Sequence, residues 1–138
     1  AAFVTHTHRD HIADLVSILR DHPVPVWTSE RETLAGARTF AEGHSFEFGA
    51  LRVRPLSTWG HSPGGATYVV EGLAHPLAIV GDSLFASSMG GGMESYPDAY
   101  RNNVEKLLRL PAKTVLACGH GPLTTVGEEL AHNPFFAR

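Results

Sequence analysis

Four side chains that can bind a metal lie within six residues near the start of the chain, and this cluster constrains the fold more than any other feature. They are His6, His8, Asp10 and His11. The apolar residues before His6 are typical of a buried strand, and apolar residues recur at helical spacing after His11. On an extended backbone the side chains of His6 and His8 leave the same face, and ligands at a helix start can turn back towards them. Because imidazole and carboxylate groups bind Zn2+ and Fe2+, the cluster predicts a metal site at a strand-to-helix turn.

The length and composition are those of one globular domain. The chain has 138 residues, of which 43% are hydrophobic, and this is enough to bury a single core. No apolar run reaches 18 residues, so we expect no membrane-spanning helix and no membrane partner. The net charge is -3 and no cluster of Lys or Arg occurs, so we expect a small-molecule substrate and no nucleic acid. The single cysteine, Cys118, cannot form an internal disulfide, and we expect a cytoplasmic protein.

Strands alternate with helices in the hydrophobic pattern, which indicates an α/β or α+β layer protein. The pattern predicts strands over 1–5, 24–27, 44–48, 51–56, 67–71, 77–81 and 114–118, and helices over 12–22, 97–110 and 126–132. Asp10 is placed to cap the first of these helices. Residues 87–92 contain three consecutive glycines and predict a flexible surface loop.

Three further candidate ligands lie at the ends of predicted strands, in loops rich in glycine or proline. They are His61, Asp82 and His120. Loops held by a rigid scaffold are where proteins present functional groups. The remaining histidines lie near turns, prolines or a helix end, and we expect them to be solvated bystanders. These are His22, His44, His75 and His132.

The chain resembles the metallo-β-lactamase-fold hydrolases over nearly its whole length, because four segments match motifs of that family in the same order. The segments are 6–11 (His-Thr-His-Arg-Asp-His), 60–64 (Gly-His-Ser-Pro-Gly), 81–85 (Gly-Asp-Ser-Leu-Phe) and 119–124 (Gly-His-Gly-Pro-Leu-Thr). The last two are most similar to the short glyoxalase-II-like branch. The resemblance implies an α/β fold of the αββα sandwich type, the metallo-β-lactamase fold.

The resemblance also implies two divalent metal ions, with Zn2+ as the expected metal and iron as the alternative. The implied ligands are His6, His8 and His61 for one ion, Asp10, His11 and His120 for the other, and Asp82 between them. Such a pair of ions can share a hydroxide, since metal binding lowers the pKa of water from 15.7 towards about 7. The bridging hydroxide would attack the carbonyl carbon of a small thioester, lactone or ester. Asp10 would act as a catalytic residue that both binds metal and orients the nucleophile.

Relative to this family the chain is short at both ends. Five residues precede His6, whereas the family places several strands before this motif, and no helical glyoxalase II domain follows His120. We therefore expect residues 1–138 to be a single metallo-hydrolase domain, the C-terminal two-thirds of a full sandwich, apparently lacking its N-terminal strands. A missing N-terminal segment or a homo-oligomer would complete the sandwich, since an unpaired strand edge favours pairing with another chain.

Two alternatives to a thioester, lactone or ester hydrolase stay open. One is a mononuclear iron persulfide dioxygenase, a redox enzyme whose resemblance to this family extends to the same first motif. The other is a truncated domain that keeps the ligands and acts only as a binding or assembly module. A β-lactamase is less favoured, because the lactamases of this fold differ around the second site, where this chain has His11.

Overall fold

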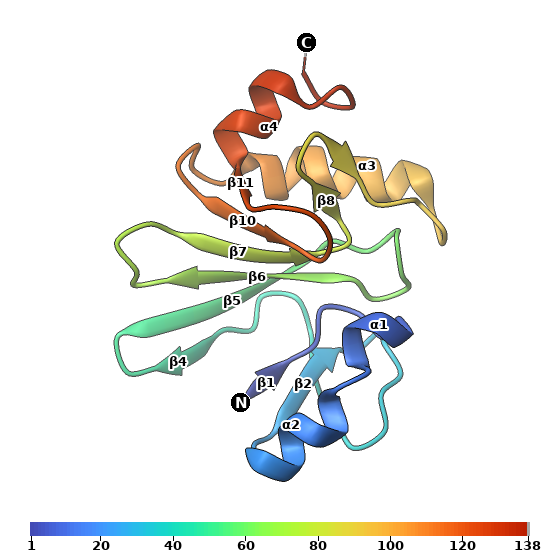
Figure 1. The fold of residues 1–138 in the computed structure, drawn as a ribbon, viewed down its shortest axis with the longest axis vertical. Coiled ribbons are helices and arrows are strands. Elements are labelled where there is room, and N and C mark those ends of the chain that lie inside the picture. The colour runs from blue at the N-terminus through green and yellow to red at the C-terminus, as the bar shows by residue number, and fades with distance from the viewer. Residues whose placement is uncertain (138) are drawn as a thin grey trace.

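The computed structural model describes residues 1–137, which form a mixed arrangement of strands and helices (Figure 1). The strands are β1 (Ala2–Phe3), β2 (Val26–Ser29), β3 (Arg38–Phe40), β4 (Phe46–Phe48), β5 (Leu51–Ser57), β6 (Ala66–Glu71), β7 (Leu77–Gly81), β8 (Leu84–Phe85), β9 (Ser88–Met89), β10 (Val115–Cys118) and β11 (Thr124–Thr125). The helices are α1 (Arg9–Ile12), α2 (Leu15–Asp21), α3 (Tyr96–Glu105), the 3-10 helix η1 (Leu107–Arg109) and α4 (Val126–His132). Within the described residues, no helix is long and apolar enough to cross a membrane.

The largest sheet has six strands in the order β11-β10-β7-β6-β5-β4. The strands from β4 to β7 pair antiparallel with their neighbours, whereas β10 pairs parallel with β7. Because parallel strands end at the same edge of a sheet, the residues that follow β7 and β10 come together there. Those residues are Asp82 and, after Gly119, His120. The register of β10 shifts between Ala117 and Cys118, directly before this edge.

A smaller sheet of three parallel strands, in the order β1-β2-β3, packs against one face of the large sheet. Aromatic side chains fill the space between the two sheets. Phe3 from β1 lies 4.9 Å from Phe46 and 5.1 Å from Tyr68, measured between ring centroids. Such aromatic contacts bury large apolar areas and contribute beyond that burial. They hold β1, and with it the segment that follows β1, against the large sheet.

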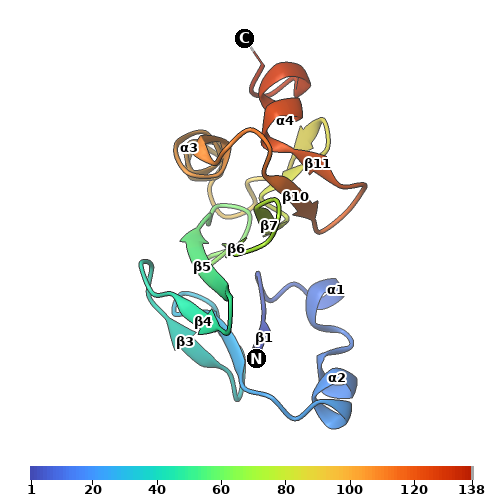
Figure 2. The same cartoon turned by 90° about the vertical axis from the view of Figure 1, so that its left-hand side faces the viewer.

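The opposite face of the large sheet is covered by α3, η1 and α4. Successive side chains of β6 point to opposite faces of the large sheet. Tyr68 and Val70 point to the small sheet, and Val69 points to the helices. Leu107, Leu116 and other buried apolar residues complete the second core. Figure 2 shows α1 and α2 beside β1, on the opposite side from β4 and β5. The order helix, sheet, sheet, helix is the α/β sandwich that the sequence predicts.

The first predicted helix differs from the structure in two ways. It is divided into α1 and α2, and none of the residues of α2 is buried. Val16, on the predicted apolar face, is 81% exposed. The prediction that Asp10 caps this helix is wrong, because His8 occupies the N-cap position and Asp10 lies within α1. The carboxylate of Asp10 instead faces two histidines, as described below.

The prediction of a flexible surface loop at residues 87–92 is only partly correct, because residues 90–92 form a loop but Ser88–Met89 is a strand and Met89 and Gly90 are buried. Part of this segment forms a hairpin of β8 with β9, and Met89 is only 7% exposed. The carboxylate of Glu129, itself buried, accepts a hydrogen bond from the backbone amide of Ser87 at 3.0 Å. The side-chain amide of Asn133 donates to the carbonyl oxygen of Ser88 at 2.9 Å. These contacts from α4 and the residue after it fix the hairpin, and the glycines that follow it reach the candidate site.

Candidate metal centre

The structure brings all seven predicted ligands together at one edge of the sandwich. Each stands where a strand ends or a helix begins, because the chain turns at this edge. His6 and His8 lie in the segment between β1 and α1, and Asp10 and His11 lie in α1. His61 lies in the loop between β5 and β6. Asp82 directly follows β7, and His120 follows β10 after Gly119. Their donor atoms form three overlapping groups, each with its atoms within 4.8 Å of one another. The groups are His6, His8 and His61; His6, His11 and Asp82; and Asp10, His11 and His120.

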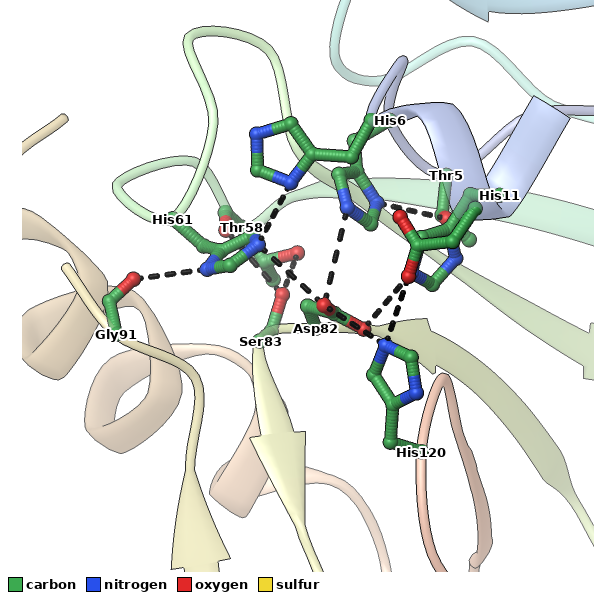
Figure 3. Close-up of polar contacts among 11 residues, drawn as sticks. Thr5, His6, His11, Thr58, His61, Asp82, Ser83, Gly91 and His120 are labelled. Carbon is green, nitrogen blue, oxygen red and sulfur yellow. Dashed lines mark hydrogen bonds and ion pairs between the residues drawn. The ribbon is translucent and has the colours of Figure 1, made fainter. Parts of the chain in front are cut away.

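The carboxylate of Asp82 lies at the middle of the site (Figure 3). Its Oδ2 atom is 3.4 Å from Nε2 of His61, 3.5 Å from Nε2 of His120 and 3.9 Å from Nε2 of His6. Its Oδ1 atom is 3.2 Å from Nε2 of His11. One buried carboxylate therefore faces four imidazole nitrogens and separates the outer groups of ligands.

The two outer groups close the site on either side of Asp82. On one side, Nε2 of His61 lies 3.1 Å from Nδ1 of His8. On the other, Oδ2 of Asp10 lies 3.1 Å from Nε2 of His120 and 3.5 Å from Nε2 of His11. Three histidines thus face one another on the first side. Two histidines and a carboxylate do so on the second.

The donor set fits a divalent cation. Three of its buried atoms have no hydrogen-bond partner in the described part of the protein: Nε2 of His6, Nε2 of His11 and Oδ1 of Asp82. Buried polar atoms are nearly always satisfied, so these atoms call for a ligand. Burial, together with the neighbouring His11, lowers the pKa of His6 to about 4, which leaves its ring neutral at pH 7. Neutral imidazole and carboxylate are the groups that bind Zn2+ and iron in proteins.

A contact behind His61 fixes the direction of its ring. Nδ1 of His61 lies 2.8 Å from the carbonyl oxygen of Gly91, and a protonated Nδ1 donates a hydrogen bond to it. This arrangement leaves Nε2 as the free donor atom that faces Asp82 and the other ligands. Gly91 belongs to the segment for which the sequence predicts a surface loop. Its role as a ring partner is therefore absent from the sequence prediction.

Glycine is required where the chain passes the central carboxylate. A Cβ atom at Gly119 would collide with the carboxylate of Asp82 and lie 2.7 Å from Cε1 of His11. A Cβ atom at Gly90 would collide with the backbone carbonyl oxygen of Asp82. These close approaches give a physical reason for the glycine before His120 and for one of the glycines after β9.

Glu32 is a second feature that sequence reasoning misses. It lies in a turn after β2 and is 7% exposed. Burial by itself raises the pKa of its carboxyl group, but hydrogen bonds, among them those from the Thr7 hydroxyl and the Gly64 amide, outweigh burial and hold that pKa below its usual value. The carboxylate is therefore ionised at neutral pH. No spacing rule links a glutamate in this turn to residues 25 and 32 positions away.

The four remaining histidines lie outside the three groups of donor atoms. They are exposed: His22, His44, His75 and His132. Cys118 is half-buried at the end of β10 and also lies outside the groups. Burial raises the pKa of its thiol to about 11, so the thiol is protonated at neutral pH. Five of the nine histidines therefore come together at the candidate centre and four lie apart from it, and the binding of metal by the five stays a prediction.

Comparison with known proteins gives the same class of protein as the fold and the site. The family model described as the metallo-beta-lactamase superfamily matches residues 1–120. A hydroxyacylglutathione hydrolase from Brucella ovis is 35% identical over 121 residues, which are 86% of this chain and 46% of that protein. The crystal structure of BLEG-1 B3 metallo-beta-lactamase is 30% identical with a TM-score of 0.87, covering 100% of this chain and 77% of that one. The crystal structure of TTHA1623 in a di-iron-bound form is 26% identical with a TM-score of 0.81, covering 98% and 76%.

The chain belongs to the metallo-beta-lactamase superfamily, a group of proteins that bind divalent metals. This confirms the resemblance stated for its four motifs and the fold class that the resemblance implies. Curated relatives of the chain include hydroxyacylglutathione hydrolases, and the chain spans about half of their length, 46% for the two first matched.

Proposed function

We propose that the chain is a metal-dependent hydrolase of small thioesters, lactones or esters. One observation carries the proposal: a buried carboxylate, Asp82, has a group of three potential ligands on each side. The similarity to a hydroxyacylglutathione hydrolase at 35% identity supports a thioester as the first substrate class to test. The similarity to a B3 metallo-beta-lactamase at 30% identity makes a β-lactam the second.

Two ions are proposed, in the arrangement that the resemblance implies. One would be held by His6, His8 and His61, the other by Asp10, His11 and His120, with Asp82 shared between them. A bound divalent cation lowers the pKa of coordinated water towards about 7 and polarises a carbonyl oxygen, so it supplies both a nucleophile and an electrophile at neutral pH. Zn2+ is the proposed metal. Iron is the alternative, since a relative at 26% identity was crystallised in a di-iron-bound form.

The protein's own side chains give the site a closed end and an open end. The Asp82 side chain is 9% exposed, whereas those of Asp10 and His120 are 59% and 57% exposed. Substrate would therefore approach along the Asp10 side. A hydrogen bond that the Asp10 carboxylate accepts from its own backbone amide, together with nearby histidines, holds the pKa of this carboxyl below its usual value. The ionised Oδ2 can accept a hydrogen bond from an attacking water and orient it towards a carbonyl carbon, which is the catalytic role proposed for Asp10.

The proposal is tested by counting metal and measuring hydrolysis on the same preparation. Elemental analysis of the chain is expected to give close to two equivalents of metal, and a panel containing a glutathione thioester, a lactone, an aryl ester and a β-lactam is expected to give turnover. The variant His61→Ala is expected to lose hydrolysis and to hold less than two equivalents of metal, whereas His75→Ala, which replaces an exposed histidine outside the site, is expected to keep both the metal and the turnover. Less than one equivalent of metal with no hydrolysis of any substrate would refute the proposal and favour a binding or assembly module. One equivalent of iron with oxygen uptake on glutathione persulfide would instead establish the dioxygenase alternative.

A further inference from the structure

The segment that carries two of the histidine ligands is held from behind by a side chain outside the metal centre. Thr7 stands between His6 and His8, and alternate residues of an extended segment point to opposite sides. The hydroxyl of Thr7 donates a hydrogen bond to Oε2 of Glu32 at 2.5 Å. Because Glu32 holds Thr7 on the side of the segment away from the metal centre, it also fixes the direction in which His6 and His8 point.

The other oxygen of the same carboxylate holds the loop that carries the third histidine. The backbone amide of Gly64 donates to Oε1 of Glu32 at 3.0 Å, and this contact is buried. Gly64 follows His61 by three residues in the β5–β6 loop. A Cβ atom at Gly64 would lie 2.7 Å from the backbone of Arg31 and of Glu32, so the loop packs directly on this turn. The guanidinium of Arg31 also stacks 4.1 Å above the ring of Trp59 in the same loop.

We infer that Glu32 is a positioning residue for the metal centre, which joins the His6–His8 segment to the His61 loop and so preorganises the group of three histidines. The inference rests on the proposed metal centre and adds a residue to it. Glu32 touches none of the seven ligands through the hydrogen bonds described; it acts through Thr7 and Gly64. A buried carboxylate is costly unless donors satisfy it. Here each oxygen has its donor, and each donor belongs to a different ligand-bearing segment.

The arrangement also predicts which half of the centre depends on Glu32. His120 and Asp10 stand on the end of β10 and in α1, and neither of the two hydrogen bonds of Glu32 reaches those elements. Without Glu32, the three histidines must be brought together by the metal itself, so ordering of two loops would oppose binding. The cost should therefore fall on the equivalent of metal held by the three-histidine group. The second equivalent should change less.

The test uses Co2+ as a probe in place of Zn2+, because its visible absorption reports the coordination geometry. The chain and its variants are stripped with chelator and titrated with Co2+ in competition with a chromophoric chelator. Glu32→Ala is expected to weaken the equivalent of metal held by the three-histidine group about 10- to 100-fold, the usual effect of losing a group that orients metal ligands. Thr7→Val removes one of the two contacts and is expected to give a smaller loss in the same direction. Glu30→Ala, an exposed glutamate in the same turn, is the matched control and is expected to bind as the unchanged chain does.

Rescue separates positioning from a general loss of stability. Thr7→Ser keeps the hydroxyl, and Glu32→Gln keeps both contacts, because its amide oxygen can accept from Gly64 and its amide nitrogen can donate to the Thr7 hydroxyl. Both are expected to restore most of the affinity and the absorption spectrum. Circular dichroism and thermal unfolding of the metal-free variants show whether each one folds. If Glu32→Ala does not fold, the pair Thr7→Val and Thr7→Ser decides.

Wild-type affinity and spectrum in both Glu32→Ala and Thr7→Val would overturn the inference and leave the proposed function intact. The same holds if Thr7→Val and Thr7→Ser weaken binding equally, because the hydroxyl would then be irrelevant. Failure of the unchanged chain to bind Co2+ or Zn2+ at all would overturn both the inference and the proposed metal centre.

Discussion

The two halves of the candidate metal centre differ in how much protein surrounds them. On one side, the side chains of His6 and His61 are 2% and 12% exposed. On the other side, those of Asp10 and His120 are 59% and 57% exposed, and only that of His11, at 13%, is largely covered. Asp82 lies between them and belongs with the buried half at 9%. The buried half is therefore shaped by the fold, and the exposed half is where solvent and substrate can arrive.

The difference follows from what supports each half. The ring of His61 is fixed by the carbonyl oxygen of Gly91, and the segment before α1 is fixed through Thr7 and Glu32. The exposed half stands on α1, which has four residues and no side-chain cap, and on the loop after β10. Preorganised ligands bind with less loss of conformational freedom. We therefore expect the first equivalent of metal to enter the buried half and the second to bind more weakly.

The largest effect is expected from Asp82, because it serves both halves. Asp82→Asn keeps the size of the side chain but removes the charge that faces four imidazoles. We expect both equivalents of metal to weaken and hydrolysis to fall by more than about 100-fold, beyond the usual cost of losing an indirect partner of a metal. Metal analysis and kcat on the best substrate of the panel measure this. If Asp82→Asn kept the affinity of either metal equivalent, or kept the hydrolytic activity, Asp82 would not link the two halves.

The comparison between the halves is tested most directly by one histidine from each. His61→Ala is expected to weaken the tighter equivalent of metal by at least about 100-fold, because it removes a ligand and the loss of an indirect partner alone costs about 10- to 100-fold. His120→Ala should leave the tighter equivalent nearly unchanged and weaken the second. Calorimetric titration of the metal-free variants with Zn2+ resolves the two equivalents. If His120→Ala weakened the tighter equivalent instead, the exposed half would be the primary site and the order of binding would be reversed.

A smaller effect is expected at acid pH from the carboxylate behind the buried half. The pKa of Glu32 is lowered in the folded protein, so the unfolded chain takes up this proton first as the pH falls. The stability that the ionised carboxylate contributes is therefore complete above the ordinary pKa of 4.5 and is lost as the pH falls through the lower folded value. Urea unfolding of the metal-free chain measures this between pH 7 and pH 3. Glu32→Gln should show a shallower fall over the acid range, and an identical fall in both proteins would contradict it.

The seven residues that come together at the candidate centre could be singled out from the sequence because each is marked by local chemistry. The cluster at 6–11 concentrates donors at a strand-to-helix turn, and His61, Asp82 and His120 stand beside glycines at the ends of strands whose apolar patterns are clear. Since β7 and β10 end at one edge, Asp82 and His120 meet there. Helix α4 and the hairpin of β4 with β5 also lie where the pattern predicts them.

What the sequence does not reveal depends on contacts between distant segments. The contact of Gly91 with His61 and that of Gly64 with Glu32 join residues 30 and 32 positions apart, and no periodicity encodes such pairs. Short elements such as β3, β8, β9 and β11 have too few residues for an alternating pattern to be recognised. The glycines at 90–92 form a loop after β9, as local propensity predicts, but Gly90 is buried and Gly91 contacts the ring of His61.

The smallest effect is expected at Cys118, which adjoins the exposed half without contributing to it. The side chain packs against the larger core and lies two residues before His120. Cys118→Ala should lower the free energy of unfolding by about 1 kcal/mol through lost packing, measured by urea denaturation, and should leave both metal affinities unchanged. If the second equivalent weakened by tenfold or more while the first was kept, the sulfur would belong to the exposed half. Metal binding by the exposed half would then depend on the packing of β10 as well as on α1. The exposed half would in that case be supported by the core, and the proposed difference between the two halves would be wrong.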